Sequence, residues 1–227
     1  MSANLSSILY LVTGVLFILA LRGLSSPETS RQGNFFGIVG MILAIVVTFF
    51  SVEIFSNNLI FFIVALSAGG IIGSLIAYKI PMTAMPQLVA GFHSLVGLAA
   101  VLVAVSAYYS PEAFNLGTSG NIKTASIIEM GIGVSIGALT FSGSIIAFLK
   151  LQGIMSGSPI TFSGQHLLNG LIGALIIFLI GFLVFNQTSE VFWILILASF
   201  FIGFLIIIPI GGADMPVVIS MLNSYSG

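Results

Sequence analysis

The chain has 227 residues, of which 58% are hydrophobic and 5% are charged, and its formal net charge is −1. About a quarter of the residues in a soluble domain are charged. This composition, with a mean hydropathy of +1.24, therefore excludes a soluble globular protein and indicates an integral protein of the lipid bilayer. The near-neutral charge gives no sign of nucleic-acid binding. The lack of cysteine excludes disulfides, iron–sulfur clusters and thiolate zinc sites.

Long apolar runs predict the fold. A helix needs roughly 20 apolar residues to cross the hydrocarbon of a bilayer. The sequence contains seven such runs, at residues 5–21, 35–55, 59–77, 86–108, 124–149, 165–185 and 190–210. An eighth begins at Pro216, and the sequence stops about a dozen residues later, too few to span. We predict an all-α polytopic bundle of about eight transmembrane helices, the last one cut short. Residues 1–227 should form one transmembrane domain that is incomplete at its C-terminus.

Two further patterns concern packing and the membrane surface. The stretches Gly69–Gly73 and Gly133–Gly137 each place glycines four residues apart, which lets helix backbones approach closely, as in ordinary bundle packing. Trp193, Tyr108 and Tyr109 lie near the ends of spans, where amphipathic rings form an interfacial belt.

The basic residues predict the orientation, because cytoplasmic loops of membrane proteins are enriched in lysine and arginine. With alternating spans, four of them fall on one side of the membrane: Arg22, Arg31, Lys79 and Lys150. Only Lys123 falls on the other side. We therefore expect the N-terminus outside. The loops expected in the cytoplasm are 22–34, 78–85, 150–164 and 211–215.

His93 is an ionisable side chain inside an apolar run. Its span starts from the cytoplasmic side at Pro86, which places His93 seven residues in, roughly 10 Å along a helix. A titratable side chain is costly to bury in hydrocarbon without a function or a partner. Imidazole is also the side chain whose unperturbed pKa lies nearest physiological pH. His93 is therefore the first candidate for a functional site.

Asn223 is predicted at the same depth. The eighth run starts from the same side at Pro216, and Asn223 also follows seven residues later. Ser220 lies one turn before Asn223 and Ser224 lies beside it, so the three form a polar stripe. A hydrogen bond between His93 and Asn223 that only joins two helices is one interpretation. A site that handles protons is the other, and we favour it.

Two carboxylates have similar alternatives. Asp214 precedes Pro216, where it can cap the helix by accepting from free backbone amides, or can serve as the cytoplasmic mouth of a proton path. Glu129 lies about five residues inside its span from the outer side. Its carboxylate can reach the membrane surface or form the outer part of the same path.

Motifs of known enzyme chemistry are missing from the sequence. It has no glycine-rich nucleotide loop after a strand, no Walker loop, no zinc-protease motif and no serine-hydrolase motif. We therefore expect no catalytic, cofactor-binding or metal-binding residue in this segment.

Several stretches resemble the membrane domain of the beta subunit of proton-translocating nicotinamide nucleotide transhydrogenase. The most specific is GGADMPVVISMLNSYSG at residues 211–227. GLSSPETSRQGN at residues 23–34 resembles the first cytoplasmic loop of the family. HSLVGLAAVLV at 93–103 and GALTFSGS at 137–144 add to the similarity.

The resemblance implies a function for the whole chain. Such enzymes transfer hydride between NADH and NADP+ while protons cross the membrane. Residues 1–227 would be the proton-channel domain, with NAD(H) and NADP(H) bound on other domains. The implied partners are an alpha subunit with NAD(H)-binding and membrane parts, a C-terminal NADP(H)-binding domain, and a second copy of the whole complex. The implied location is an inner membrane of bacterial type, and this segment alone should catalyse nothing.

The resemblance also assigns residues. The membrane histidine of the family corresponds to His93, its partner asparagine to Asn223 and its aspartate at the helix mouth to Asp214. Its acidic residue in the span after the histidine corresponds to Glu129. Gln87 stands where family members commonly carry glutamate, which argues against an essential acid at that position.

Two other interpretations stay open. A proton-coupled secondary transporter would use His93 in a substrate site near the midplane, between broken helices. A non-catalytic anchor or assembly subunit would tolerate the loss of His93.

Overall fold

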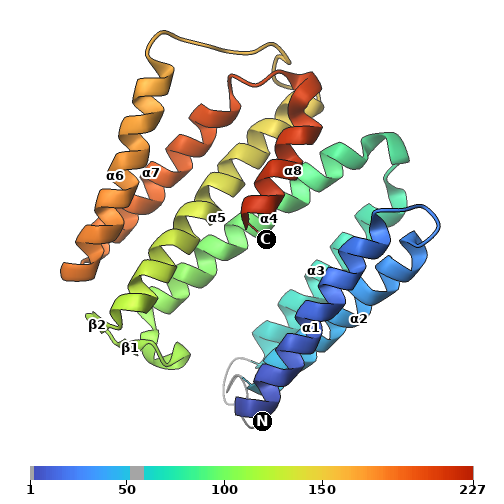
Figure 1. Ribbon diagram of the computed structural model, residues 1–227, viewed down its shortest axis with the longest axis horizontal. Coiled ribbons are helices and arrows are strands. Elements are labelled where there is room, and N and C mark those ends of the chain that lie inside the picture. Colours follow the sequence, from blue (N-terminus) through green and yellow to red (C-terminus); the bar gives the residue numbers. More distant parts are fainter. Residues whose placement is uncertain (1–2, 52–58, 227) are drawn as a thin grey trace. The chain divides into compact units, whose positions relative to one another are not determined.

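The protein, seen in a computed structural model, is almost entirely helical over the residues that the structure describes, 3–51 and 59–226 (Figure 1). The α-helices of this described part are α1 (Ala3–Leu24), α2 (Ser30–Ser51), α3 (Leu59–Lys79), α4 (Met85–Tyr109), α5 (Thr124–Leu151), α6 (Gln165–Phe185), α7 (Ser189–Ile207) and α8 (Met215–Ser226). Seven are long and apolar enough to cross a membrane, and α8 has 12 residues. The predicted polytopic all-α bundle is confirmed.

Helix bounds follow the predicted spans closely, with physical reasons for the differences. α2 begins at Ser30, before its apolar run, because the polar segment that follows Ser30 packs as helix against α1. Residues 52–55 of the second predicted span lie outside the described residues. α7 ends at Ile207 because Pro209 lacks a backbone N–H with which to continue the helical hydrogen bonds.

Short elements in the loops were not predicted, because they have too few residues to show a hydrophobic period. They are the 3₁₀ helices η1 (Met82–Ala84), η2 (Pro111–Phe114) and η3 (Gly212–Asp214), and the strands β1 (Gly117–Thr118) and β2 (Asn121–Ile122). The two strands pair antiparallel. Gly120, in the turn between them, has a φ of +78°, a backbone conformation that glycine adopts without steric cost.

The chain forms two compact units, Met1–Tyr78 and Lys79–Gly227. In the first, α1 and α2 pack as a close antiparallel pair. A Cβ atom added to Gly23 would lie 2.5 Å from the Cα of Gly33, so the two backbones touch at this point. The Thr29 hydroxyl closes the connection by donating to the Gly23 carbonyl (2.7 Å).

The second unit is organised around α5, which packs against α4, α6, α7 and α8 (Figure 1). α4 and α5 cross at glycines: a Cβ added to Gly97 would lie 2.7 Å from the Gly137 carbonyl oxygen. This confirms a close approach at Gly137. Cβ atoms added to Gly69, Gly73 or Gly133 would meet no atom within 4 Å in the described chain.

One end of the second unit, called here the Pro86 end, holds the start of α4, the end of α5 and the linkers between α5 and α6 and between α7 and α8. Gln87 donates from its amide to the Leu151 carbonyl at the end of α5 (3.4 Å). The two linkers are joined by a hydrogen bond from Gly212 N–H to the Gly157 carbonyl (2.8 Å). α4 and α8 therefore start at the same end.

The opposite end, called the Gln187 end, is closed by side-chain hydrogen bonds. The Gln187 amide bonds both backbone groups of Ile122, at 2.8 and 2.9 Å, and Tyr108 donates to the Gln187 carbonyl (2.8 Å). Trp193 donates from its indole to the Tyr109 hydroxyl (3.0 Å). The predicted aromatic belt residues thus gather at one end of this unit.

Candidate functional site

His93 is buried where α4 meets α8. Its side chain is 5% exposed, and its imidazole donates a hydrogen bond to the backbone carbonyl of Leu222 on α8. His93 follows Met85, the first residue of α4, by eight residues, about 12 Å along the helix. A titratable ring is therefore held between two helices well inside the apolar part of the bundle.

Asn223 lies at the matching position of α8, eight residues after Met215. Because both helices start at the Pro86 end, His93 and Asn223 lie equally far from that end along their helices, and their equal depth in a bilayer stays a prediction. Leu222, the residue before Asn223, carries the carbonyl that His93 contacts. The residue on α8 that His93 contacts is therefore the immediate neighbour of Asn223 in the chain. Whether their side chains interact directly or through water stays a prediction.

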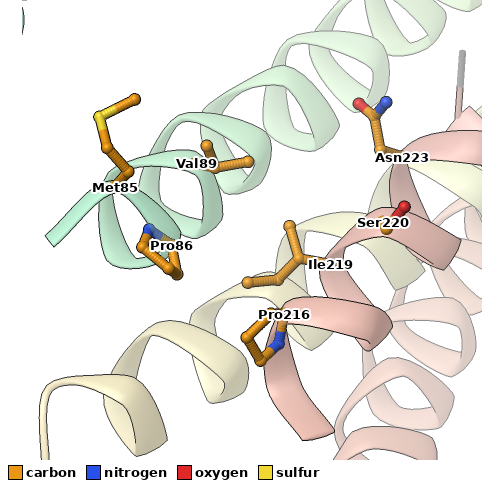
Figure 2. Close-up of a pocket in the computed structure, with 7 residues that line it drawn as sticks. All are labelled: Met85, Pro86, Val89, Pro216, Ile219, Ser220 and Asn223. Atoms are coloured by element: carbon orange, nitrogen blue, oxygen red, sulfur yellow. The ribbon is translucent and has the colours of Figure 1, made fainter. Parts of the chain in front are cut away.

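A pocket of about 450 Å³ lies between the first turns of α4 and α8. Figure 2 shows Pro86 and Pro216 at its outer end, Val89 and Ile219 beyond them, and Asn223 at its inner end. Ser220 lines it beside Asn223. A mostly apolar pocket thus runs from the starts of the two helices to two polar side chains, Ser220 and Asn223. Asn223 directly follows Leu222, whose carbonyl accepts from His93.

Ser224 differs from Ser220 in its surroundings. Its hydroxyl donates to the Met221 carbonyl of its own helix (2.7 Å), as serine side chains in helices often do. Ser220 and Asn223 form the part of the predicted polar stripe that lines the pocket.

The two predicted carboxylates lie at opposite ends of the second unit. Asp214 is exposed, ends η3 and immediately precedes α8 at the Pro86 end. Glu129 is exposed on α5, in the second turn from the Gln187 end. The structure therefore brings neither carboxylate to His93, and it places one on each side of it.

Two buried hydroxyls on α5 were not predicted. Thr140 and Ser144 are 0% exposed, and their side-chain oxygens have no hydrogen-bond partner among the described residues. Both are at helical spacing from Gly137, which packs against α4. Gly143, next to Ser144, is in contact range of Leu222. Buried hydroxyls usually find a partner, often water, so these two are further polar groups inside the second unit.

Lys150 is a third residue whose surroundings sequence reasoning missed. It was interpreted as a basic anchor at the membrane surface, yet it is 4% exposed and donates to backbone carbonyls at the end of α7. A lysine in the last turn of a long helix looks the same in sequence whether it is solvated or buried.

Gln87 is a neutral hydrogen-bond donor in the first turn of α4. Its Nε2 donates to the Leu151 carbonyl, and an ionised carboxylate has no hydrogen to donate. At this position the chain uses a neutral donor to join α4 to α5.

The chemistry available at this site is proton exchange. Imidazole gains and loses a proton near neutral pH, and hydroxyl and amide groups can both donate and accept. Across residues 3–51 and 59–226, no three His, Asp or Glu side chains cluster as ligands for a metal ion.

Comparison with known proteins identifies the family of the chain. Residues 6–227 match a family model described as the NAD(P) transhydrogenase beta subunit. Two curated relatives, from Rhodospirillum rubrum and from its strain ATCC 11170, are both named NAD(P) transhydrogenase subunit beta. Each is 52% identical over all 227 residues, which cover 48% of the relative. The chain thus spans about half the length of these relatives. It belongs to the NAD(P) transhydrogenase beta subunit family.

Proposed function

We propose that this chain carries protons across the membrane for a complete transhydrogenase that transfers hydride between NADH and NADP+. NAD(H) and NADP(H) bind on other domains of the complex, and this segment binds neither. Its partners are the alpha subunit, the NADP(H)-binding domain of the beta subunit and a second copy of the complex. Family membership and the buried histidine support this proposal.

The placement of His93 is the observation that carries the proposal. A neutral imidazole has one donor nitrogen and one acceptor nitrogen. The donor is engaged with the Leu222 carbonyl, so the acceptor nitrogen is the one that takes up a proton. A packing residue at this position would have no need of a group that titrates near neutral pH.

The proposed route runs from the Pro86 end toward the Gln187 end. Asp214 lies at its mouth, and the pocket with Ser220 and Asn223 leads inward. His93 accepts the proton there, and Glu129 forms the far part of the route. We place the Pro86 end in the cytoplasm because four of the five basic residues belong to that side.

Coupling requires that nucleotide binding changes the proton affinity or the accessibility of His93. A coupling of 1–3 kcal/mol changes an affinity by about 5–150-fold. α8 is the natural transmitter, because it carries the Leu222 carbonyl that His93 contacts and starts directly after an exposed turn. A shift of α8 would change the surroundings of His93 without moving α4.

The proposal is tested by reconstituting the complete complex in lipid vesicles that contain a pH-sensitive dye. With NADH and NADP+ added outside, we expect the luminal pH to change in step with nucleotide turnover. A proton-conducting ionophore should abolish the pH change while hydride transfer continues. Sustained hydride transfer with no luminal pH change in tight vesicles would contradict the proposed function.

Orientation has its own test. Ser119, in the turn between β1 and β2, and Ala213, in η3, are exposed at opposite ends of the second unit, and the chain has no cysteine of its own. In intact cells a membrane-impermeant thiol reagent should label Ser119→Cys, and it should label Ala213→Cys only after lysis. Labelling of Ala213→Cys alone in intact cells would reverse the orientation.

A further inference from the structure

Lys150, in the last turn of α5, is a buried cation held by backbone oxygens. Its Nζ donates to the carbonyls of Ile208 (2.5 Å), Ile210 (2.7 Å) and Ser158 (3.5 Å). An ammonium has three hydrogens to donate, so these carbonyls match its full capacity. The sequence places this lysine among the positive charges at the membrane surface, whereas the structure uses it inside the protein.

Two of these carbonyls, those of Ile208 and Ile210, follow the end of α7, and the Ile208 carbonyl also accepts from Ile160 N–H (3.4 Å). The last carbonyls of an α-helix have no partner within the helix, and α7 ends at Ile207. Pro209, between Ile208 and Ile210, has no N–H to offer. A cation at this end also interacts favourably with the dipole of α7. Lys150 thereby holds the chain that leaves α7.

That chain is the short linker to α8, and it is fastened at a second place. Gly212 N–H donates to the Gly157 carbonyl (2.8 Å), and three residues later Met215 starts α8 with 0% of its side chain exposed. Met215 packs in one cluster with Ile146 of α5 and Ile207 of α7. The start of α8 is thus set by α5, through Lys150 and through this cluster.

From this start, α8 reaches the proposed proton site within two turns. Leu222 is 4% exposed, is in contact range of Gly143 on α5, and carries the carbonyl that accepts from His93. Because a helix is stiff over so short a length, the position of the linker determines where Leu222 and Asn223 stand opposite His93.

We propose that Lys150 is a positioning residue for proton transfer: by binding the carbonyls at the end of α7, it fixes the start of α8 and thus the contact between α8 and His93. The inference rests on the proposed proton function. The structural part of the inference is that Lys150 fixes the position of α8. It can be measured without any proton movement.

The variants are Lys150→Met, which keeps the apolar stem and removes the donors, Lys150→Gln, which keeps a shorter amide donor, and Lys150→Arg, which keeps charge and donors. Lys123→Met is the matched control, because Lys123 is exposed at the Gln187 end and donates to one carbonyl, that of Asn115 (3.0 Å). All are made in the complete complex.

The first measurement reports the position of α8. Val89→Cys on α4 and Ser220→Cys on α8 line the same pocket from its two sides (Figure 2). Bifunctional thiol reagents of graded length measure the distance between the two introduced thiols. We expect Lys150→Met to change the reagent length that links them best, Lys150→Gln to change it less, and Lys150→Arg and Lys123→Met to leave it unchanged.

The second measurement is the ratio of protons moved to hydride transferred in vesicles, with single variants and native Val89 and Ser220. We expect Lys150→Met to lower this ratio at least about tenfold, since it removes the donor to the Ile208 and Ile210 carbonyls that fixes the start of α8, and to move the pH midpoint of the coupled reaction. Lys150→Arg should restore both the ratio and the midpoint. If Lys150→Met does not assemble, Lys150→Gln gives the same comparison with part of the donor capacity kept.

The outcomes separate the two claims. An unchanged crosslinking pattern in Lys150→Met or Lys150→Gln would overturn the positioning role, and so would failure of Lys150→Arg to recover. A changed pattern with a normal proton ratio would leave the hold of Lys150 on α8 standing and would contradict the proton route past His93.

Discussion

Replacing His93 with alanine is expected to abolish proton pumping by the complete enzyme. Hydride transfer between NADH and NADP+ should slow at least about 100-fold, the range typical of losing a positioned acid–base group, because the coupled cycle cannot turn over without its proton step. Nucleotide binding should largely survive, since the nucleotide domains fold outside the bilayer. Proton uptake and nucleotide turnover are measured together in vesicles of the complete complex.

The chain supplies a matched control in its other histidine. His166 is exposed at the start of α6, so His166→Ala should pump at the wild-type rate. Wild-type pumping by His93→Ala would make His93 a packing residue. That result would favour the interpretation of this segment as a membrane anchor.

Replacing Asn223 with leucine should impair proton transfer while leaving the bundle assembled. An amide donates to neutral imidazole and accepts from imidazolium, so it can serve both protonation states, and leucine can do neither. We expect the pH dependence of the coupled reaction to shift and the pumping rate to fall about tenfold, equivalent to about 1.4 kcal/mol. Assembly should persist, because Asn223 lines a pocket and is exposed in the described chain.

Ser224→Ala is the control for this substitution. Its hydroxyl bonds a carbonyl of its own helix, so removal of the hydroxyl should leave the pH dependence unchanged. A structure of the complete enzyme in which Asn223 and His93 point into different helix interfaces, with no water between them, would refute the pairing. So would an unchanged pH dependence in Asn223→Leu.

The geometry bears on the secondary-transporter interpretation. Such a protein would hold its substrate near the midplane, between broken helices. Here the pocket lies between the first turns of α4 and α8, and each of these is a single unbroken helix over the described residues. The pocket suits an approach for water and protons better than a substrate site.

Hydropathy and counting were enough to predict the spans and the starts of α4 and α8. These predictions depend on the length and hydropathy of each helix and on the residues at its start, which the local sequence determines. The proline at the second residue of α4 and of α8 marked where each helix starts, and the structure confirms both starts.

Tertiary contacts determine what the sequence could not show. Lys150 is buried because it donates hydrogen bonds to carbonyls of a linker some sixty residues away in the chain. No local sequence pattern predicts this contact. Thr140 and Ser144 are buried on α5, which α4 crosses at Gly97, and their burial depends on this tertiary packing. The spacing of Gly133 and Gly137 was equal in sequence to that of Gly69 and Gly73, yet only Gly137 meets another helix in the described chain.

The central claim, that His93 itself gains and loses the transported proton, is tested most directly by difference infrared spectroscopy on the complete enzyme containing isotope-labelled histidine. Spectra are recorded as bound NADP+ is exchanged for NADPH. The account predicts an isotope-sensitive imidazole band that changes with protonation, vanishes in His93→Ala and persists in His166→Ala. The same band persisting in His93→Ala, or no imidazole change in the wild-type enzyme during coupled turnover, would contradict it.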